Sequence, residues 1–221
     1  MGEAELEIQP LTPDRWDDLV TVFDRPGDAK GCWCMFYRVR GRDFDRLWGK
    51  GARAAFRGVV ADGPPPGLLA YRDGAPVGWC AVAPRDDFPR ILNSRVLRPV
   101  DDAPACWAVV CFYVVRDERR GGVAAALLEA AVAFAADHGA AAVEGYPKDT
   151  AGEKKHANEM FVGSMSMFAE AGFEDTAQIA NARWKQLLAS YEDPGIDGAV
   201  DEELRAFMDR RKAEPPPDEE H

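Results

Sequence analysis

Hydrophobic and polar positions along this chain follow two periods, and the change between them separates strands from helices. Alternation over residues 5–9 predicts a strand. Thr12 and Pro13 follow it, and they predict a helix start because threonine caps helices and proline fits their first turn. After a glycine-containing break at residues 27–31, helical spacing returns over residues 43–60.

A hairpin and a central strand come next. Apolar segments at residues 67–72 and 76–82 flank an Asp-Gly dipeptide, which suits the positive φ angles of a tight β-hairpin turn. Residues 84–104 lack a clear period and form a long connection of the kind that often borders a site. Residues 105–115 are apolar throughout, which predicts a central strand covered on both faces.

Helices and strands alternate again after the central strand. Residues 123–137 are rich in alanine and predict a helix that ends at Gly139. A further strand is expected to start at Val143. Residues 159–171 predict a last helix, and residues 173–187 have the character of a strand.

One domain with a C-terminal tail is the predicted organisation. With 221 residues, 47% of them apolar, the chain can bury one core, which we assign to residues 1–190. Residues 191–221 are acidic and proline-rich and predict a tail that is partly helical or disordered. The sequence shows neither an apolar run of the roughly 18 residues that span a membrane nor a signal peptide. We therefore expect a cytoplasmic monomer or homodimer with no membrane partner.

Charge and cysteine content narrow the classes of partner. The formal net charge of −11 disfavours nucleic acid, whose phosphates are bound by concentrated lysine and arginine, and it suits a cationic small molecule. The five cysteines form no disulfide framework. The segment Cys32-Trp33-Cys34 has no second Cys/His pair at zinc spacing, so we expect no metal.

The segment from Arg119 to Ala124, where the central strand runs into a helix, has the character of an anion site. Amide groups at a helix start are unpaired, the helix dipole is positive there, and glycines allow close approach to the backbone. Guanidinium groups add bidentate hydrogen bonds to phosphate oxygens. The segment lacks the spacing of nucleoside triphosphate and dinucleotide loops. The segment alone fits a phosphate-binding turn and a solvated turn equally well.

The motif Arg119-x-x-Gly122-x-Ala124 after this strand resembles the Arg/Gln-x-x-Gly-x-Gly/Ala signature of the GNAT superfamily of acyl-CoA-dependent N-acyltransferases. The order of the surrounding elements, over about residues 5–187, is similar as well. The resemblance implies an α/β fold with a mixed, mostly antiparallel central sheet flanked by helices. It also implies acetyl-CoA as co-substrate, with no metal.

The resemblance implies where the coenzyme lies. Its pyrophosphate would sit on the turn, and its pantetheine arm would pair with the central strand, where one N–H would point at the thioester oxygen. The turn residues concerned are Arg119, Arg120, Gly121, Gly122, Val123 and Ala124. The strand residues are Phe112, Tyr113 and Val114.

Acyl transfer to an amine needs a base, because an amine with a pKa of about 10.4 must lose a proton before it attacks. Glu144 is the first candidate, unless it is an ordinary solvent-facing strand residue. His156 is the second, although its surroundings predict an exposed loop. For the acid, the resemblance implies a tyrosine where this sequence has Phe168. Either Ser164, Ser166, Tyr146 or a water molecule supplies the proton instead, or the thiolate leaves unassisted.

Four residues are candidates for the acceptor pocket, because the first helices and the hairpin often frame that pocket in the superfamily: Trp33, Tyr37, Arg38 and Trp79. A place in the core is the alternative for each. The predicted function is acetyl transfer to a primary amine of a small cationic metabolite or antibiotic-like molecule. The alternatives are a non-catalytic acyl-CoA-binding or sensing module, which the Phe168 substitution favours, and a protein N-acetyltransferase.

Overall fold

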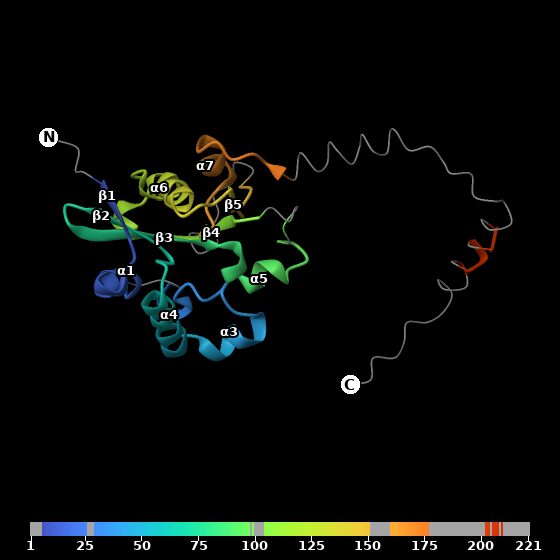
Figure 1. Ribbon diagram of the computed structural model, residues 1–221, viewed down its shortest axis with the longest axis horizontal. Helices are drawn as coiled ribbons and strands as arrows, with labels where there is room; N and C mark the ends of the chain where they lie inside the picture. Colours follow the sequence, from blue (N-terminus) through green and yellow to red (C-terminus); the bar gives the residue numbers. More distant parts are fainter. Residues whose placement is uncertain are drawn as a thin grey trace. The chain divides into compact units, whose positions relative to one another are not determined.

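The computed structural model describes residues 6–25, 29–97, 99, 104–150 and 160–176, with a few helical positions between 202 and 209 (Figure 1). Contacts divide the chain into two units, Met1–Glu174 and Asp175–His221. This division precedes the boundary at residue 190 that the sequence suggested, and residues 177–190 lie outside the described ranges. All the elements named below belong to the first unit.

A five-stranded sheet forms the centre of the first unit, with its strands in the order of the chain. The contacts from the first strand to the fourth are antiparallel, and the last pair is parallel. The predicted fold class, a mixed and mostly antiparallel sheet flanked by helices, is therefore confirmed. The strands are β1 (Leu6–Pro10), β2 (Gly67–Arg72), β3 (Ala75–Pro84), β4 (Cys106–Val114) and β5 (Ala142–Gly145).

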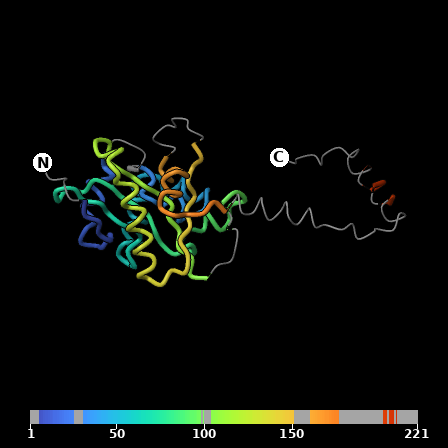
Figure 2. The backbone as a smooth tube through the Cα atoms, turned by 90° about the horizontal axis from the view of Figure 1, so that it is seen from above, coloured from blue at the N-terminus to red at the C-terminus, as the bar shows by residue number. Residues whose placement is uncertain are grey.

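Helices cover both faces of the sheet (Figure 1). On one side lie η1 (Pro13–Arg15), α1 (Trp16–Phe23), α2 (Ala29–Cys32), α3 (Gly41–Leu47) and α4 (Lys50–Asp62). On the other lie α6 (Val123–Asp137) and α7 (Met165–Glu170). Seen from above in Figure 2, α6 crosses the strands. The connections contain η2 (Arg85–Asp87), α5 (Pro89–Leu92) and η3 (Arg116–Glu118).

The predicted hairpin joins β2 to β3 and supports α6. Asp73 and Gly74 adopt φ angles of 50° and 76°, as the turn requires. At Gly78 on β3, a Cβ atom would lie 2.9 Å from Val123 and 3.2 Å from Leu127. The missing side chain therefore lets α6 pack directly on the strand, so that the start of α6 has a fixed position beside β3 and β4.

Aromatic side chains fill the opposite face. Trp79 is fully buried, and its ring meets the edges of Phe23 and Phe56 at centroid distances of 6.1 and 5.9 Å. Trp33 packs with Phe23 at 5.4 Å and stacks on Trp16 at 5.6 Å. These rings come from α1, α4, β3 and the turn after α2, which they join into one core.

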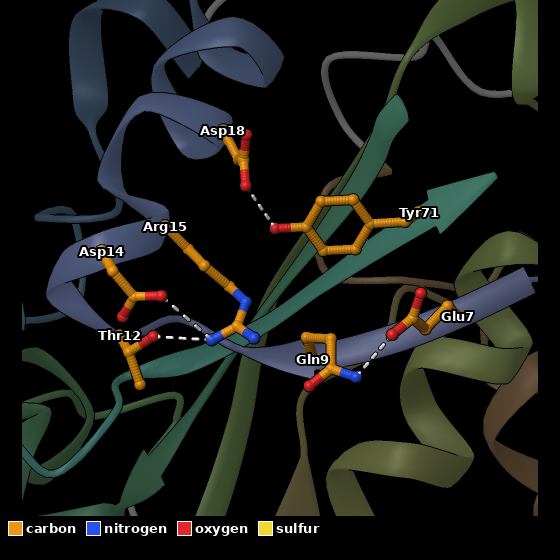
Figure 3. Close-up of polar contacts among 7 residues, drawn as sticks. All are labelled: Glu7, Gln9, Thr12, Asp14, Arg15, Asp18 and Tyr71. Atoms are coloured by element: carbon orange, nitrogen blue, oxygen red, sulfur yellow. Dashed lines mark hydrogen bonds and ion pairs between the residues drawn. The ribbon is translucent and has the colours of Figure 1, made fainter. Parts of the chain in front are cut away.

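Polar contacts hold α1 against the sheet (Figure 3). The hydroxyl of Tyr71 on β2 donates to Asp18 on α1 at 2.7 Å. Thr12 was expected to cap the first helix, but its hydroxyl makes no capping bond and instead accepts from Arg15 at 2.8 Å. The guanidinium competes successfully for that oxygen, so proline at the first position, rather than a side-chain cap, marks the helix start.

Two predicted helices differ from those observed. The predicted helix over residues 43–60 is two helices, α3 and α4, because Gly49 breaks the chain with a φ of 81°. The last helix begins only after Ser164, and the part predicted before residue 160 lies outside the described residues. None of the helices within the described ranges has the length and apolar character that crossing a membrane requires.

Candidate functional site

Strands β4 and β5 separate midway along β4 and form a fork. Their parallel pairing runs from Cys106 opposite Ala142 to Val109 opposite Gly145 and goes no further. At the same point the pairing with β3 shifts, because Ala81 faces Cys111 while Val82 faces Val109. Val110 is thus the extra residue of a β-bulge, a feature that often re-aims backbone groups beside active sites.

The bulge decides which backbone groups face the fork. The N–H of Val115 donates to Val77 on β3, so alternate residues before it point the other way. Phe112 and Val114 accordingly direct their N–H and C=O groups toward the fork. Tyr113 lies opposite Trp79 and uses its backbone within the sheet, so of these three strand residues Phe112 and Val114 turn their backbone groups toward the fork.

A short segment of the chain already lies in the fork. The N–H of Phe112 donates to the carbonyl of Phe161 at 2.6 Å, and the N–H of Lys148 donates to that of Gly163 at 3.0 Å. Lys148 also forms an isolated parallel bridge with Ser164. The residues from Phe161 to Ser164 therefore act as a partial strand between β4 and the chain after β5.

The start of α6 lies at the end of β4 and has no side-chain cap. Gly122 is the N-cap residue, in the left-handed conformation with a φ of 77°, and the first helical bond runs from Ala126 to its carbonyl. The first turn carries no acidic side chain. The amides of Val123, Ala124 and Ala125 are therefore unpaired within the helix, and the helix dipole there is not neutralised.

Arginines surround this turn. Arg119 donates from Nε to the carbonyl of Val114 at 3.0 Å, which ties the turn to the strand end, and Arg120 is exposed with a φ of 66°. Arg72 forms an ion pair with Glu118 at 2.8 Å, and its Nη2 atom would lie 3.9 Å from a Cβ atom at Gly121. Arg72 thus balances the carboxylate nearest to the turn.

Glu144 lies on β5 opposite Ala108, one residue before the pairing of β4 with β5 ends, and therefore at the base of the fork. Its two oxygens are both engaged, Oε2 by Arg85 at 3.2 Å and Oε1 by the Tyr146 hydroxyl at 2.5 Å. Burial raises the pKa of Tyr146, and its hydrogen bond to Glu144 acts in the same direction. Burial lowers the pKa of Arg85, but Glu144 outweighs it, so the pKa is raised overall. Tyr146 is therefore a protonated donor at neutral pH.

The side chains of the four acceptor candidates are all buried, but they lie at different distances from the fork. Trp33 and Trp79 are enclosed by aromatic rings, with exposed fractions of 2% and 0%, so they have no free surface for a ligand in this structure. Their stacking against α1 and α4 explains this burial. Tyr37 lies closer to the fork, because its ring is 6.5 Å from that of Phe161, and Arg38 follows it.

Comparison with known families gives two matches of unequal extent. The model of the acetyltransferase (GNAT) family matches residues 33–153, more than half of the chain. This chain belongs to the acetyltransferase (GNAT) family. The match contains the fork of β4 and β5 and the uncapped start of α6. A model of trimethylamine methyltransferase (MTTB) matches residues 162–216, a much smaller part that lies mainly outside the described residues.

Solved structures similar to this GNAT chain are remote in sequence. The aminoglycoside N-acetyltransferase AAC(6')-Iy, in complex with a bisubstrate analogue, is 15% identical, with 78% of this chain and 93% of that chain covered at a TM-score of 0.49. A GCN5-related N-acetyltransferase from Ralstonia eutropha is 18% identical, with coverage of 77% and 94% at a TM-score of 0.44. No curated protein matches the sequence.

Position 168, where the resemblance implied a tyrosine, carries a ring without a hydroxyl. Phe168 is buried, and at Gly145 a Cβ atom would collide with its ring, so the ring packs directly on the β5 backbone. Ser164 caps α7 by accepting from the N–H of Met167 at 3.3 Å, and it also contacts Ser166 at 3.0 Å. His156 lies outside the described residues.

Three further residues of this GNAT site did not stand out in the sequence. Arg85 directly follows the buried strand β3, and this position was the one feature of the sequence that could have indicated a buried cation at the end of the strand. Arg72 ends the hairpin strand, and only the turn connection brings it beside Glu118. Phe161 carries no sequence signal, because its contribution to the fork is a backbone carbonyl.

Proposed function

We propose that this chain transfers the acetyl group of acetyl-CoA to a primary amine of a small molecule. The observation that carries the proposal is the junction of β4 with α6, where a forked strand edge leads into an uncapped, arginine-flanked helix start. Phosphates suit the unpaired amides after Gly122, and a thioester arm suits the strand edge. The net charge of −11 favours an acceptor that is cationic over a nucleic acid.

The coenzyme would use the two halves of this junction. The pyrophosphate would accept from the amides that follow Gly122, with Arg120 free to reach it from the surface. The pantetheine arm would pair with Phe112 and Val114, and one of these N–H groups would stabilise the negative charge that develops on the thioester oxygen. Because the carbonyl of Phe161 now holds the N–H of Phe112, the arm must displace it.

Transfer requires one proton to leave the amine and one to reach the sulfur. The neutral amine attacks the thioester carbon, and the tetrahedral intermediate collapses to an amide and a coenzyme thiolate. Glu144, at the base of the fork, is the proposed acceptor of the amine proton. Tyr146 is the proposed donor to the thiolate, because its phenol is protonated at neutral pH, and the tyrosinate that remains recovers a proton from protonated Glu144, its hydrogen-bond partner.

Release of free thiol from acetyl-CoA tests the proposal. Purified protein is incubated with acetyl-CoA and a panel of primary amines, and Glu144→Gln serves as the matched variant because it keeps the size of the side chain and one oxygen that accepts from Arg85 or Tyr146, but carries no basic carboxylate. We expect acetyl-CoA to raise the melting temperature of both proteins and thiol release to fall about 100-fold in the variant. Equal thiol release by the two proteins would remove Glu144 from the mechanism.

A non-catalytic acyl-CoA-binding module is the second candidate. It is favoured by Phe168, whose ring supplies no proton, and by the engagement of both Glu144 oxygens. This candidate predicts thermal stabilisation by acetyl-CoA without thiol release for any amine of the panel. If acetyl-CoA gives no stabilisation, both candidates are wrong.

A further inference from the structure

Arg38 presents a buried guanidinium with an unused edge. Its side chain is 6% exposed and lies between α2 and α3, and its Nη1 atom pairs with Asp87 at 3.2 Å. Its Nε and Nη2 atoms are closed to solvent and have no hydrogen-bond partner in the described part of the chain. An arginine stays charged in proteins, and a buried donor without a partner is costly, so this arrangement calls for an anion.

The geometry of the unused atoms specifies the kind of anion. Nε and Nη2 carry parallel N–H groups along one edge of the planar guanidinium, which matches the two oxygens of a carboxylate. The face of the group is covered by the ring of Phe88, whose centroid is 4.9 Å away. Asp87 occupies Nη1 only. A single carboxylate in the guanidinium plane would therefore satisfy both remaining atoms.

We propose that the acceptor amine carries a carboxylate, which binds the Nε–Nη2 edge of Arg38. This inference rests on the proposed function, and it restricts the acceptor to amino acids and related amino-carboxylates. Because the edge is closed to solvent in the ligand-free structure, the carboxylate must displace the side chains that cover it. Asp87, with 45% of its side chain exposed, shows that the guanidinium lies just below the surface.

The short helix η2 links this edge to the proposed base. Asp87 at its end pairs with Arg38, and Arg85 at its start pairs with Glu144. A 3-10 helix rises about 2.0 Å per residue, so the two ion pairs start about 4 Å apart along its axis. One short helix therefore carries a partner of the proposed base and a partner of the proposed carboxylate site.

A second arginine on α5 adds positive charge to the same region. Arg90 also has a buried Nε atom without a partner among the described residues, and its guanidinium lies 3.9 Å from the ring centroid of Phe36. Its backbone N–H donates to the carbonyl of Tyr37, next to Arg38, at 3.2 Å. Arg38 and Arg90 therefore both lie at the segment between α2 and α3, and two positive charges there favour an anionic group on the ligand.

Matched acceptors that differ only in the carboxylate test the inference. L-Lysine and L-ornithine are compared with cadaverine and putrescine, the diamines that lack the carboxyl group, in the thiol-release assay. We expect wild-type kcat/KM to be at least 10-fold higher for the amino acids, and we expect Arg38→Met to abolish this ratio. Arg57→Met is the control, since Arg57 also stacks on an aromatic ring, that of Trp16 at 5.7 Å, but lies on α4. It should retain the ratio.

Arg38→Lys keeps the charge without the paired N–H edge, and it remains informative if Arg38→Met does not fold. It too should lose at least 10-fold in the ratio. A wild-type ratio near one, or a ratio unchanged in Arg38→Lys, would overturn the inference. Calorimetric titration of L-lysine and L-ornithine without acetyl-CoA separates the two proposals. If these amino acids bind wild type but not Arg38→Lys, and no thiol is released, the carboxylate site stands and the transfer reaction does not.

Discussion

The carbonyl oxygen of Phe161 accepts a hydrogen bond from the backbone N–H of Phe112 at 2.6 Å, across the fork between β4 and β5. In the proposed reaction the same N–H serves the pantetheine arm of acetyl-CoA. The chain and its coenzyme therefore compete for one donor, and binding includes the free energy needed to move Phe161. The apparent affinity for acetyl-CoA is therefore reduced in proportion to the fraction of molecules whose fork is open.

Shortening the side chain of Phe161 should strengthen coenzyme binding. Its ring anchors the segment against Phe36 and Tyr37, at centroid distances of 6.2 and 6.5 Å. Phe161→Ala removes this anchor, so the open fraction rises, and we expect the Kd for acetyl-CoA to fall about 3- to 10-fold. Calorimetric titration measures the Kd. Phe173→Ala is the control, because Phe173 packs on Phe168 at 4.9 Å; a weaker affinity in Phe161→Ala alone would show that the segment forms part of the binding site.

Gly122 should tolerate alanine sterically but not conformationally. A Cβ atom there meets nothing within 4 Å, yet the φ of 77° is left-handed, which costs an alanine about 1–2 kcal/mol. We expect Gly122→Ala to lose this stability and to weaken acetyl-CoA at least 10-fold, because the added methyl group lies where phosphate must approach. Gly139→Ala, at the other end of α6 with a φ of 80°, should lose similar stability without affecting the coenzyme. Parallel losses of affinity in both variants would assign the effect to helix stability.

Arg72 should support the coenzyme by neutralising Glu118. The pair is at 2.8 Å beside the turn, so Arg72→Met leaves a carboxylate close to the incoming pyrophosphate. We expect the Kd for acetyl-CoA to rise about 3- to 10-fold at low salt, which corresponds to about 1 kcal/mol. The double variant Arg72→Met/Glu118→Gln should recover most of the affinity. Failure of this rescue would mean that Arg72 contacts the phosphates itself.

Alkaline pH should destabilise the fold through its buried tyrosines. Burial raises the pKa of Tyr37 from 10.0 to about 12, with Cys111 adding to the rise and Arg90 opposing it. The pKa values of Tyr71 and Tyr146 are raised as well, by burial first and then by hydrogen bonds to Asp18 and Glu144. The unfolded chain then loses protons that the folded chain keeps, so stability is intact below about pH 9 and falls above pH 10.

Urea unfolding between pH 8 and pH 11.5 measures this loss. Each such tyrosine contributes a slope of up to about 1.4 kcal/mol per pH unit above its unfolded pKa. Tyr37→Phe should make the dependence of the unfolding free energy on pH less steep, by the contribution of about one proton.

Sequence patterns predicted those parts of the molecule that depend on local chemistry. The hairpin followed from Asp73-Gly74, and the uncapped helix start followed from Gly122 at the end of an apolar strand. The position of the Phe161 carbonyl could not be predicted, because it depends on backbone direction. The two ion pairs of η2, Asp87 with Arg38 and Arg85 with Glu144, could not be predicted either, because they join segments far apart in the chain. The complete burial of Trp79 could not be predicted either, because an aromatic side chain on a strand beside the predicted site fits both a ligand contact and a place in the core.

Restoring the tyrosine of the GNAT family at position 168 should not restore a proton donor. Phe168 is 2% exposed, and its ring packs on the backbone of Gly145 and 6.2 Å from the ring of Phe112. A hydroxyl added there would be buried next to carbon atoms, which costs about 1–3 kcal/mol when no partner is found. We expect Phe168→Tyr to unfold at lower urea concentration than wild type and to release thiol no faster. A gain of 10-fold or more in kcat would instead show that α7 can supply the acid, and it would move that role from Tyr146 to position 168.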